Sequence, residues 1–129
     1  MTRAAFRTLP AALAAGLLTA FAACGSNEDP PAGAKKMAFE LTDAGCSPHD
    51  ASVAAGPIHF QIENGGTAKV TEMEIMEGDK VLGERENITE GLSSDFTLTL
   101  EKGSYTIYCP GGSDERGTLT VTGEASGRQ

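Results

Sequence analysis

Residues 55–64 read AGPIHFQIEN, and their order of apolar and polar side chains is the strongest indication of the fold class. A Gly-Pro pair lies near its start, after which apolar side chains stand at positions 58, 60 and 62 and polar ones at 59, 61 and 63. Such alternation is typical of a β-strand with one buried face, because successive side chains point to opposite faces. The stretch therefore predicts a strand that places Phe60 in the core and His59 on an outer, water-exposed face.

The same alternation recurs in three further runs, at residues 37–41, 96–100 and 119–121. Glycine-rich turn signals, such as those at 64–66 and 110–112, separate the runs, and no stretch keeps a helical period for three turns. Strands with one apolar face need a second sheet to cover them. We therefore expect an all-β, Greek-key β-sandwich in one domain over residues 37–123, with a disordered tail at 124–129.

The N-terminus has the layout of an export signal. Two arginines precede an uncharged, Ala- and Leu-rich run that ends in small residues before Cys24. This end resembles the lipobox of bacterial lipoproteins, although Phe21 departs from it. We expect a lipoprotein signal peptide at 1–23, a lipidated Cys24 that anchors the protein to the outside of the bacterial cell membrane, and a flexible tether at 24–36. The alternative is ordinary cleavage that leaves Cys24 as a free thiol.

Charge restricts the class of partner. The whole chain carries a formal charge of −8, and removal of residues 1–23 takes away two of ten basic residues and none of the eighteen acidic ones, which leaves −10. Such a surface repels nucleic acid and concentrates cations. The sequence contains no P-loop, dinucleotide-binding or G-x-S-x-G motif. We therefore expect a binding protein for a cation rather than an enzyme, although a bound metal could have a redox role.

Two cysteines remain in the expected domain, Cys46 and Cys109. They are distant in sequence, but strand ends can meet at one pole of a sandwich. Two cysteines in an exported domain commonly form a disulfide. The alternative is a pair of thiolates that bind a metal ion, and the residues alone leave both open.

Residues 55–64, followed by Gly103–Cys109 and Gly117–Val121, resemble the strand pattern of cupredoxins. The chain departs from blue-copper members of that fold in its ligand positions. No His lies soon after Asn64, and neither His nor Met follows Cys109 in the next loop. A blue-copper site of two His and one Cys is therefore not available by position.

A closer resemblance is to the cupredoxin domain of the EfeO-type iron-uptake proteins, over about residues 39–123. It rests on residues 41–48, 72–75, 84–88 and 105–109. The resemblance implies metal ligands at Cys46, Glu72 and Cys109 and a role in Efe-type iron uptake beside an iron permease or peroxidase. Two thiolates and a carboxylate suit copper or zinc, whereas the surrounding glutamates suit iron, so we expect a copper or iron ion. The family's long helical C-terminal domain has no counterpart in this sequence, so the complete EfeO activity is not expected.

Weaker ligand candidates surround this set: His49, Glu74, Glu84 and Glu86. For the glutamates, the alternative is a solvated acidic surface with Arg85 paired to one of them; for His49, it is a solvated loop. Two other functions stay open. One is a disulfide-closed β-sandwich used for protein interaction, and the other is a one-electron carrier or ferrous-iron oxidase.

Overall fold

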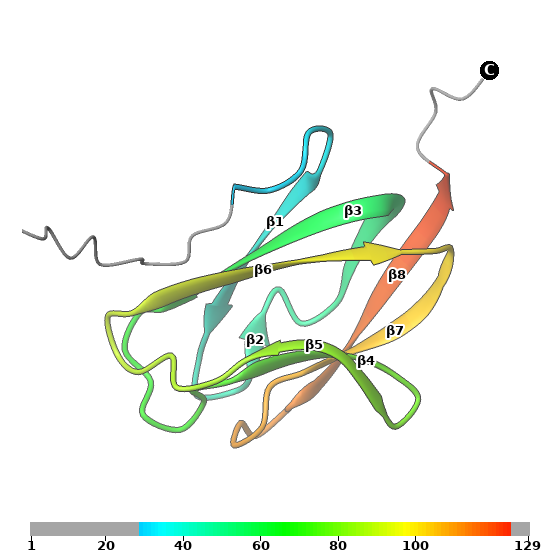
Figure 1. Ribbon diagram of the computed structural model, residues 1–129. Coiled ribbons are helices and arrows are strands. Elements are labelled where there is room, and N and C mark those ends of the chain that lie inside the picture. Colours follow the sequence, from blue (N-terminus) through cyan, green and yellow to red (C-terminus); the bar gives the residue numbers. More distant parts are fainter. Residues whose placement is uncertain (1–28, 125–129) are drawn as a thin grey trace, which may run out of the picture.

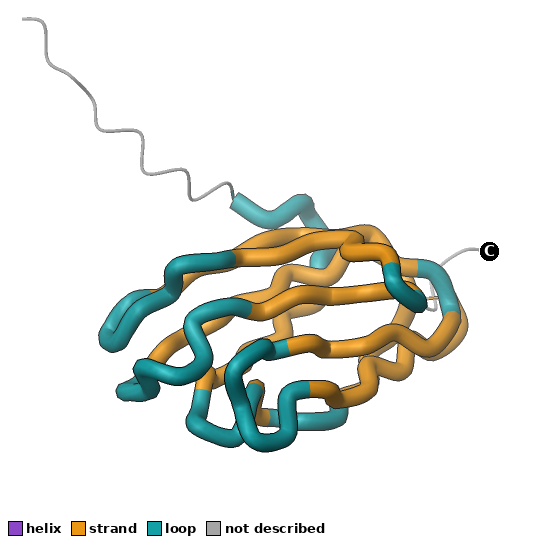
Figure 2. Tube along the Cα trace, turned by 90° about the horizontal axis from the view of Figure 1, so that it is seen from below, coloured by secondary structure: helices purple, strands orange, loops and turns teal. Residues whose placement is uncertain are grey.

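The computed structural model describes residues 29–124, so the expected signal peptide, Cys24 and the tail from 125 onward lie outside the described residues. This part of the chain consists of strands and loops (Figure 2). No helix within it is long and apolar enough to cross a membrane. The strands are β1 (Lys35–Leu41), β2 (Cys46–Ser47), β3 (Ala51–Asn64), β4 (Met73–Glu77), β5 (Lys80–Arg85), β6 (Ser93–Leu100), β7 (Gly103–Tyr108) and β8 (Arg116–Glu124). Strand β1 thus begins within the expected tether.

Strand β3 connects two sheets (Figure 1). Its first residues pair in parallel with β8, which continues through β7 and β4 to β5. Its later residues lie between β1 on one side and β6 on the other. The change of sheet coincides with a register shift at Ala54/Ala55 and with Gly56, whose φ of 121° is accessible mainly to glycine. The expected all-β sandwich is confirmed.

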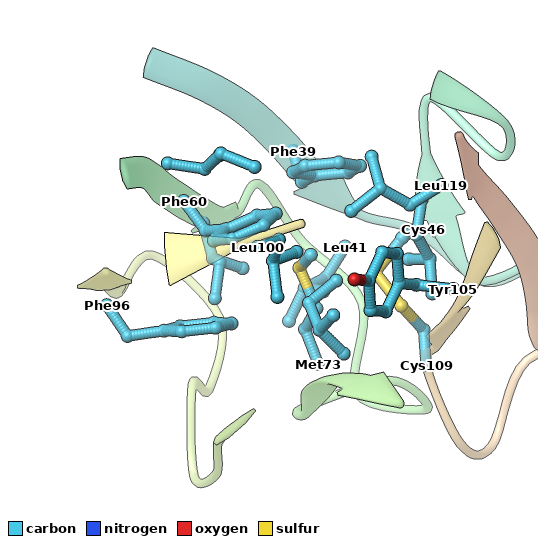
Figure 3. Packing of buried hydrophobic residues seen from close by; sticks show 14 of the residues in the cluster. Phe39, Leu41, Cys46, Phe60, Met73, Phe96, Leu100, Tyr105, Cys109 and Leu119 are labelled. Atoms are coloured by element: carbon cyan, nitrogen blue, oxygen red, sulfur yellow. A yellow bond between two sulfur atoms is a disulfide. The ribbon is translucent and has the colours of Figure 1, made fainter. Parts of the chain in front are cut away.

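The core lies between the two sheets, and aromatic residues fill one end of it. Phe60 on β3 is fully buried, and its ring stacks on Phe96 at 5.0 Å and on Phe39 at 6.2 Å between centroids (Figure 3). Phe60 comes from the middle strand of its sheet, and its two aromatic neighbours come from the flanking strands. The alternating runs therefore face inward as expected.

His59 is an exception to the expected pattern, because it does not face water. Its side chain points to the outer face of the sheet, yet the residue is only 5% exposed. Its Nδ1 lies 3.0 Å from the hydroxyl of Thr97 on the adjacent β6. The side chains of Thr97 and Asp95 on β6 lie against its ring, whereas Gln61 and Glu63 on the same face of β3 are exposed. The expectation of a solvated His59 is wrong for this reason.

Asn64, at the end of β3, organises the loops that lead to the next hairpin. It is fully buried, and its side-chain nitrogen donates to the carbonyls of Thr67, Val70 and Ile88. Its side-chain oxygen accepts from the backbone of Gly66 and Thr67. One amide thus joins the loop before β4 to the segment after β5, which fixes both ends of the β4–β5 hairpin.

Candidate metal centre

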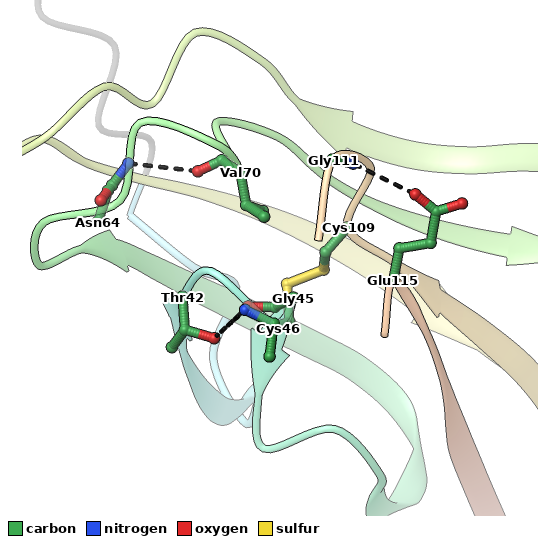
Figure 4. The surroundings of a disulfide bond; sticks show 9 residues. Thr42, Gly45, Cys46, Asn64, Val70, Cys109, Gly111 and Glu115 are labelled. Carbon is green, nitrogen blue, oxygen red and sulfur yellow. Dashed lines mark hydrogen bonds between the residues drawn. A yellow bond between two sulfur atoms is a disulfide. The ribbon is translucent and has the colours of Figure 1, made fainter. Parts of the chain in front are cut away.

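Cys46 and Cys109 are joined by a disulfide, with their Cα atoms 5.8 Å apart (Figure 4). Both residues are buried. The expected proximity of the two cysteines is therefore observed, in the disulfide form that the sequence left open. A disulfide sulfur is not a thiolate, and the thiolate is the form that binds metals. The ligand set of Cys46, Glu72 and Cys109 thus stays a prediction for the reduced protein.

Three glutamates meet on the outer face of the β4–β5 hairpin. Carboxylate oxygens of Glu72, Glu74 and Glu84 lie within 4.8 Å of one another. We call these three residues the glutamate cluster. Glu72 and Glu74 are two positions apart and therefore share a face, while Met73 between them is fully buried. Glu84 on β5 lies directly opposite Glu74 in the antiparallel register.

The pairing of the two strands continues past their ends. The amide of Ile88 donates to the carbonyl of Thr71 at 2.9 Å, which holds the residues just before β4 against those just after β5. Glu86 is thereby close enough for its charge to act on Glu72. Its carboxylate does not belong to the group whose oxygens lie within 4.8 Å of one another. The fold therefore brings together Glu72 and two of the three weaker glutamate candidates, with the third beside them.

The glutamate cluster is electrostatically unfavourable without a cation. Partial burial raises the pKa of Glu72 to about 7, and a hydrogen bond with Glu74 and the charges of Glu74, Glu86 and Glu84 add to the rise. Within residues 29–124, no lysine or arginine forms an ion pair with these glutamates. Like charges opposite each other in a sheet destabilise it. A metal ion with oxygen ligands would reverse this repulsion.

Arg85 does not neutralise the cluster. It lies opposite Met73 in the register, on the face away from Glu84, and its guanidinium stands 5.5 Å from the centroid of the Phe96 ring. The same group donates to the backbone carbonyl of Glu84, not to a carboxylate. The expected ion pair between Arg85 and a neighbouring glutamate is therefore absent, because strand alternation directs the arginine to the opposite face.

His49 lies between two carboxylates. Its Nδ1 is 3.2 Å from Asp50 Oδ1, and its Nε2 is 3.2 Å from Asp114 Oδ1. The hydrogen bond with Asp50, together with the charges of both aspartates, raises the pKa of His49 against a smaller opposing effect of burial. The backbone amide of Thr118 and then His49 lower the pKa of Asp50. We call His49, Asp50 and Asp114 the aspartate–histidine cluster.

The two ring nitrogens of His49 are thus directed at different carboxylates. No group of three close metal-ligand atoms in residues 29–124 includes this histidine. Sequence reasoning missed the two aspartates, since they come from separate loops and carry no spacing signal. The arrangement accounts for His49 as one member of an ion-pair network.

Comparison with known proteins identifies relatives of this chain. Residues 12–121 match the family model of the cupredoxin-like domain. The iron uptake system component EfeO of Escherichia coli strain K12 is 40% identical over 86 residues, which cover 67% of this chain and 23% of that protein. The EfeO of Shigella flexneri gives the same values. The chain therefore spans less than a quarter of the length of these relatives.

Solved structures share the fold at low sequence identity. Reduced auracyanin from Roseiflexus castenholzii has a TM-score of 0.59 at 17% identity, covering 70% of this chain and 99% of that one. Auracyanin A from Chloroflexus aurantiacus, a blue copper protein, has a TM-score of 0.58 at 14% identity, covering 70% and 100%. The donors of a blue-copper site do not fit here, because Cys109 is in a disulfide and the next loop lacks His and Met.

Proposed function

The chain belongs to the cupredoxin-like domain family, and on that premise we propose that it is an extracytoplasmic metal-binding protein that holds iron at the glutamate cluster. The observation that carries this proposal is the meeting of three carboxylates within 4.8 Å, with the pKa of Glu72 raised to about 7. Their charge is left without a basic side chain in residues 29–124. A bound cation supplies the missing positive charge.

The donor set favours iron over copper. Carboxylate oxygens suit hard cations, whereas thiolates suit copper in its reduced state. With Cys46 and Cys109 joined in a disulfide, oxygen is the donor type of the cluster. In a reduced protein the two thiols could join Glu72, and this set would suit copper in its reduced state.

The role in iron uptake rests on similarity to EfeO, an iron uptake system component. We propose that the protein supplies iron to an Efe-type permease or peroxidase at the outside of the membrane, held there by lipidated Cys24. The disulfide supports an oxidising compartment. If the anchor exists, Cys24→Ser should release the protein from the membrane fraction, and equal retention of both forms would reject it.

The test is a titration of the disulfide-bonded domain with ferrous iron without oxygen and, separately, with ferric citrate. Wild type should bind one equivalent, and its melting temperature should rise with ligand concentration. Glu72→Gln and Glu84→Gln should each weaken binding at least about tenfold, since each removes one ligand and one charge. Glu77→Gln is the matched control, because Glu77 lies at the end of β4 opposite Lys80 and outside the glutamate cluster. Equal binding by all four proteins would reject the site.

A second candidate function is the interaction module, which the disulfide favours because it needs no metal. It predicts no change in melting temperature with either iron salt and retention of partner binding in Glu72→Gln.

The ferrous oxidase alternative is tested by mixing the protein with ferrous iron in air. If the protein oxidises ferrous iron faster than buffer does, and Glu72→Gln does not, the site accelerates the oxidation of its iron by oxygen.

A further inference from the structure

A second polar site lies on the outer face of the other sheet. A hollow of about 600 Å³ crosses β1, β3 and β6, strands that run side by side in Figure 1. Its polar lining includes the imidazole of His59 and the carboxylate of Asp95, neither of which belongs to the glutamate cluster. Asp29 and Glu63 also line it, so the hollow is acidic. The glutamate cluster lies on β4 and β5, in the opposite sheet.

His59 is directed into this hollow without a close partner at one ring nitrogen. Its side chain is 6% exposed, and its Nδ1 lies 3.0 Å from the Thr97 hydroxyl. Its Nε2 lies 3.7 Å from Asp95 Oδ2, which is longer than a hydrogen bond. When Nδ1 donates its proton to Thr97, Nε2 presents a lone pair towards a carboxylate oxygen. In that tautomer two acceptors face each other, and a cation between them would remove their repulsion.

We propose that His59 and Asp95 hold a divalent transition-metal ion between Nε2 and Oδ2. Ligand bonds of about 2.0–2.2 Å to imidazole and carboxylate let two donors 3.7 Å apart bind the same ion. Thr97 has the position of an outer-shell partner that fixes the tautomer and the ring orientation. Gln61, opposite Asp95 in the register, or water completes the coordination. Because imidazole is a donor, the site suits zinc or copper(II) better than the glutamate cluster does.

The surrounding charges favour a cation. Asp29 and Glu63 add negative charge to that of Asp95. Lys36 lies beside His59 in the β1–β3 register, but its side chain is exposed and forms no ion pair with Asp95 in the described part of the chain. A positive ion is therefore drawn to the hollow without displacing a lysine.

The test uses zinc sulfate and a background that lacks the iron site, Glu72→Gln with Glu84→Gln. In this background, calorimetry should show one zinc ion bound per chain. Adding His59→Gln or Asp95→Asn should weaken zinc binding at least about tenfold, and Thr97→Val should weaken it less. His49→Gln is the matched control and should bind zinc as the background does. Because the glutamates are absent throughout, failure of this site is distinguishable from failure of the iron site.

A spectroscopic measurement identifies the ligand atom. In ¹⁵N-labelled protein, the His59 Nε2 resonance should shift when zinc is added. If Nε2 carries a proton and zinc leaves it unchanged, His59 and Asp95 are an ion pair and the proposal is overturned. If His59→Gln fails to fold, Asp95→Asn decides the matter, since that side chain is 26% exposed and its amide fits the same space. Zinc binding by Asp95→Asn equal to that of the background would also overturn it.

Discussion

The glutamate cluster and the aspartate–histidine cluster are both groups of acidic side chains, yet their carboxylates respond in opposite directions. The pKa of Glu72 is raised to about 7, chiefly by burial and then by its neighbour Glu74. The pKa of Asp50 is lowered, chiefly by the amide of Thr118 and then by His49. The difference lies in the neighbours: Asp50 accepts from donors, whereas Glu72 faces other acids.

The two clusters differ in whether their carboxylates have a basic partner. The aspartate–histidine cluster carries its own base, because one imidazole lies 3.2 Å from each aspartate. The glutamate cluster has no basic partner in residues 29–124. Acidic residues in a group are therefore a weak signal for a metal, and the unbalanced electrostatics of the group is a stronger one.

Removal of the Cys46–Cys109 disulfide, which links two loops, should have the largest effect. The disulfide joins Cys46, close to His49, to Cys109, which precedes the loop of Asp114, across 63 residues of chain. Cys46→Ala combined with Cys109→Ala should reduce the free energy of unfolding by about 2–5 kcal/mol. Iron affinity should stay within about twofold, because the glutamate oxygens remain. Urea unfolding and iron titration measure both quantities, and a large loss of affinity would mean that the sulfur atoms matter to the iron site.

The next largest effect is a change in stability that depends on pH and on the charge of Glu72. The folded-state pKa of Glu72 lies above its unfolded value of 4.5, so folding takes up a proton, and the cost of this group grows as pH rises from 4.5 through about 7. Glu72→Gln should therefore stabilise the metal-free protein at pH 8, by about 1 kcal/mol after allowance for solvent screening. The gain should disappear at pH 4. Chemical unfolding with a chelator present checks this, and a destabilised variant at pH 8 would contradict it.

The smallest effect is expected for Asp50→Asn, which should destabilise the protein, whereas Glu72→Gln should stabilise it. The folded pKa of Asp50 is lowered, so its stabilisation is present above its unfolded value of 3.8 and is lost as pH falls through the folded value. Asp50→Asn should lower the melting temperature at pH 6 by less than the Cys double variant does, and the difference should vanish at low pH. The matched control is Asp79→Asn, an exposed turn residue. Equal shifts in the two variants would show that the contacts of Asp50 with the Thr118 amide and with His49 contribute nothing specific.

Much of the fold, and the face on which each site residue lies, could be predicted from the sequence, because alternation determines which face a strand residue occupies. It places Glu72 and Glu74 on one face and Met73 in the core, as observed. Alternation does not reveal which strand lies beside another. The pairing of Glu74 with Glu84, and the crowding that buries His59, depend on tertiary neighbours. The choice between disulfide and thiolates depends on redox conditions, which no residue pattern encodes.

The sharing of β3 between the sheets has a consequence for how the chain folds. It has two parallel partners. One is β1, which only the short β2 separates from it along the chain, and the other is β8, the last of the strands. The sheet of β2, β1, β3 and β6 pairs strands that all precede β7 in the chain, whereas the sheet of β5, β4, β7 and β8 joins β3 only through β8. Chains dominated by such remote pairings fold slowly, in milliseconds to seconds, and usually in one cooperative step. A nascent chain released from the ribosome only as far as β7 would lack the partner for the start of β3, and β5, β4 and β7 would have no strand that joins them to β3 until β8 arrived.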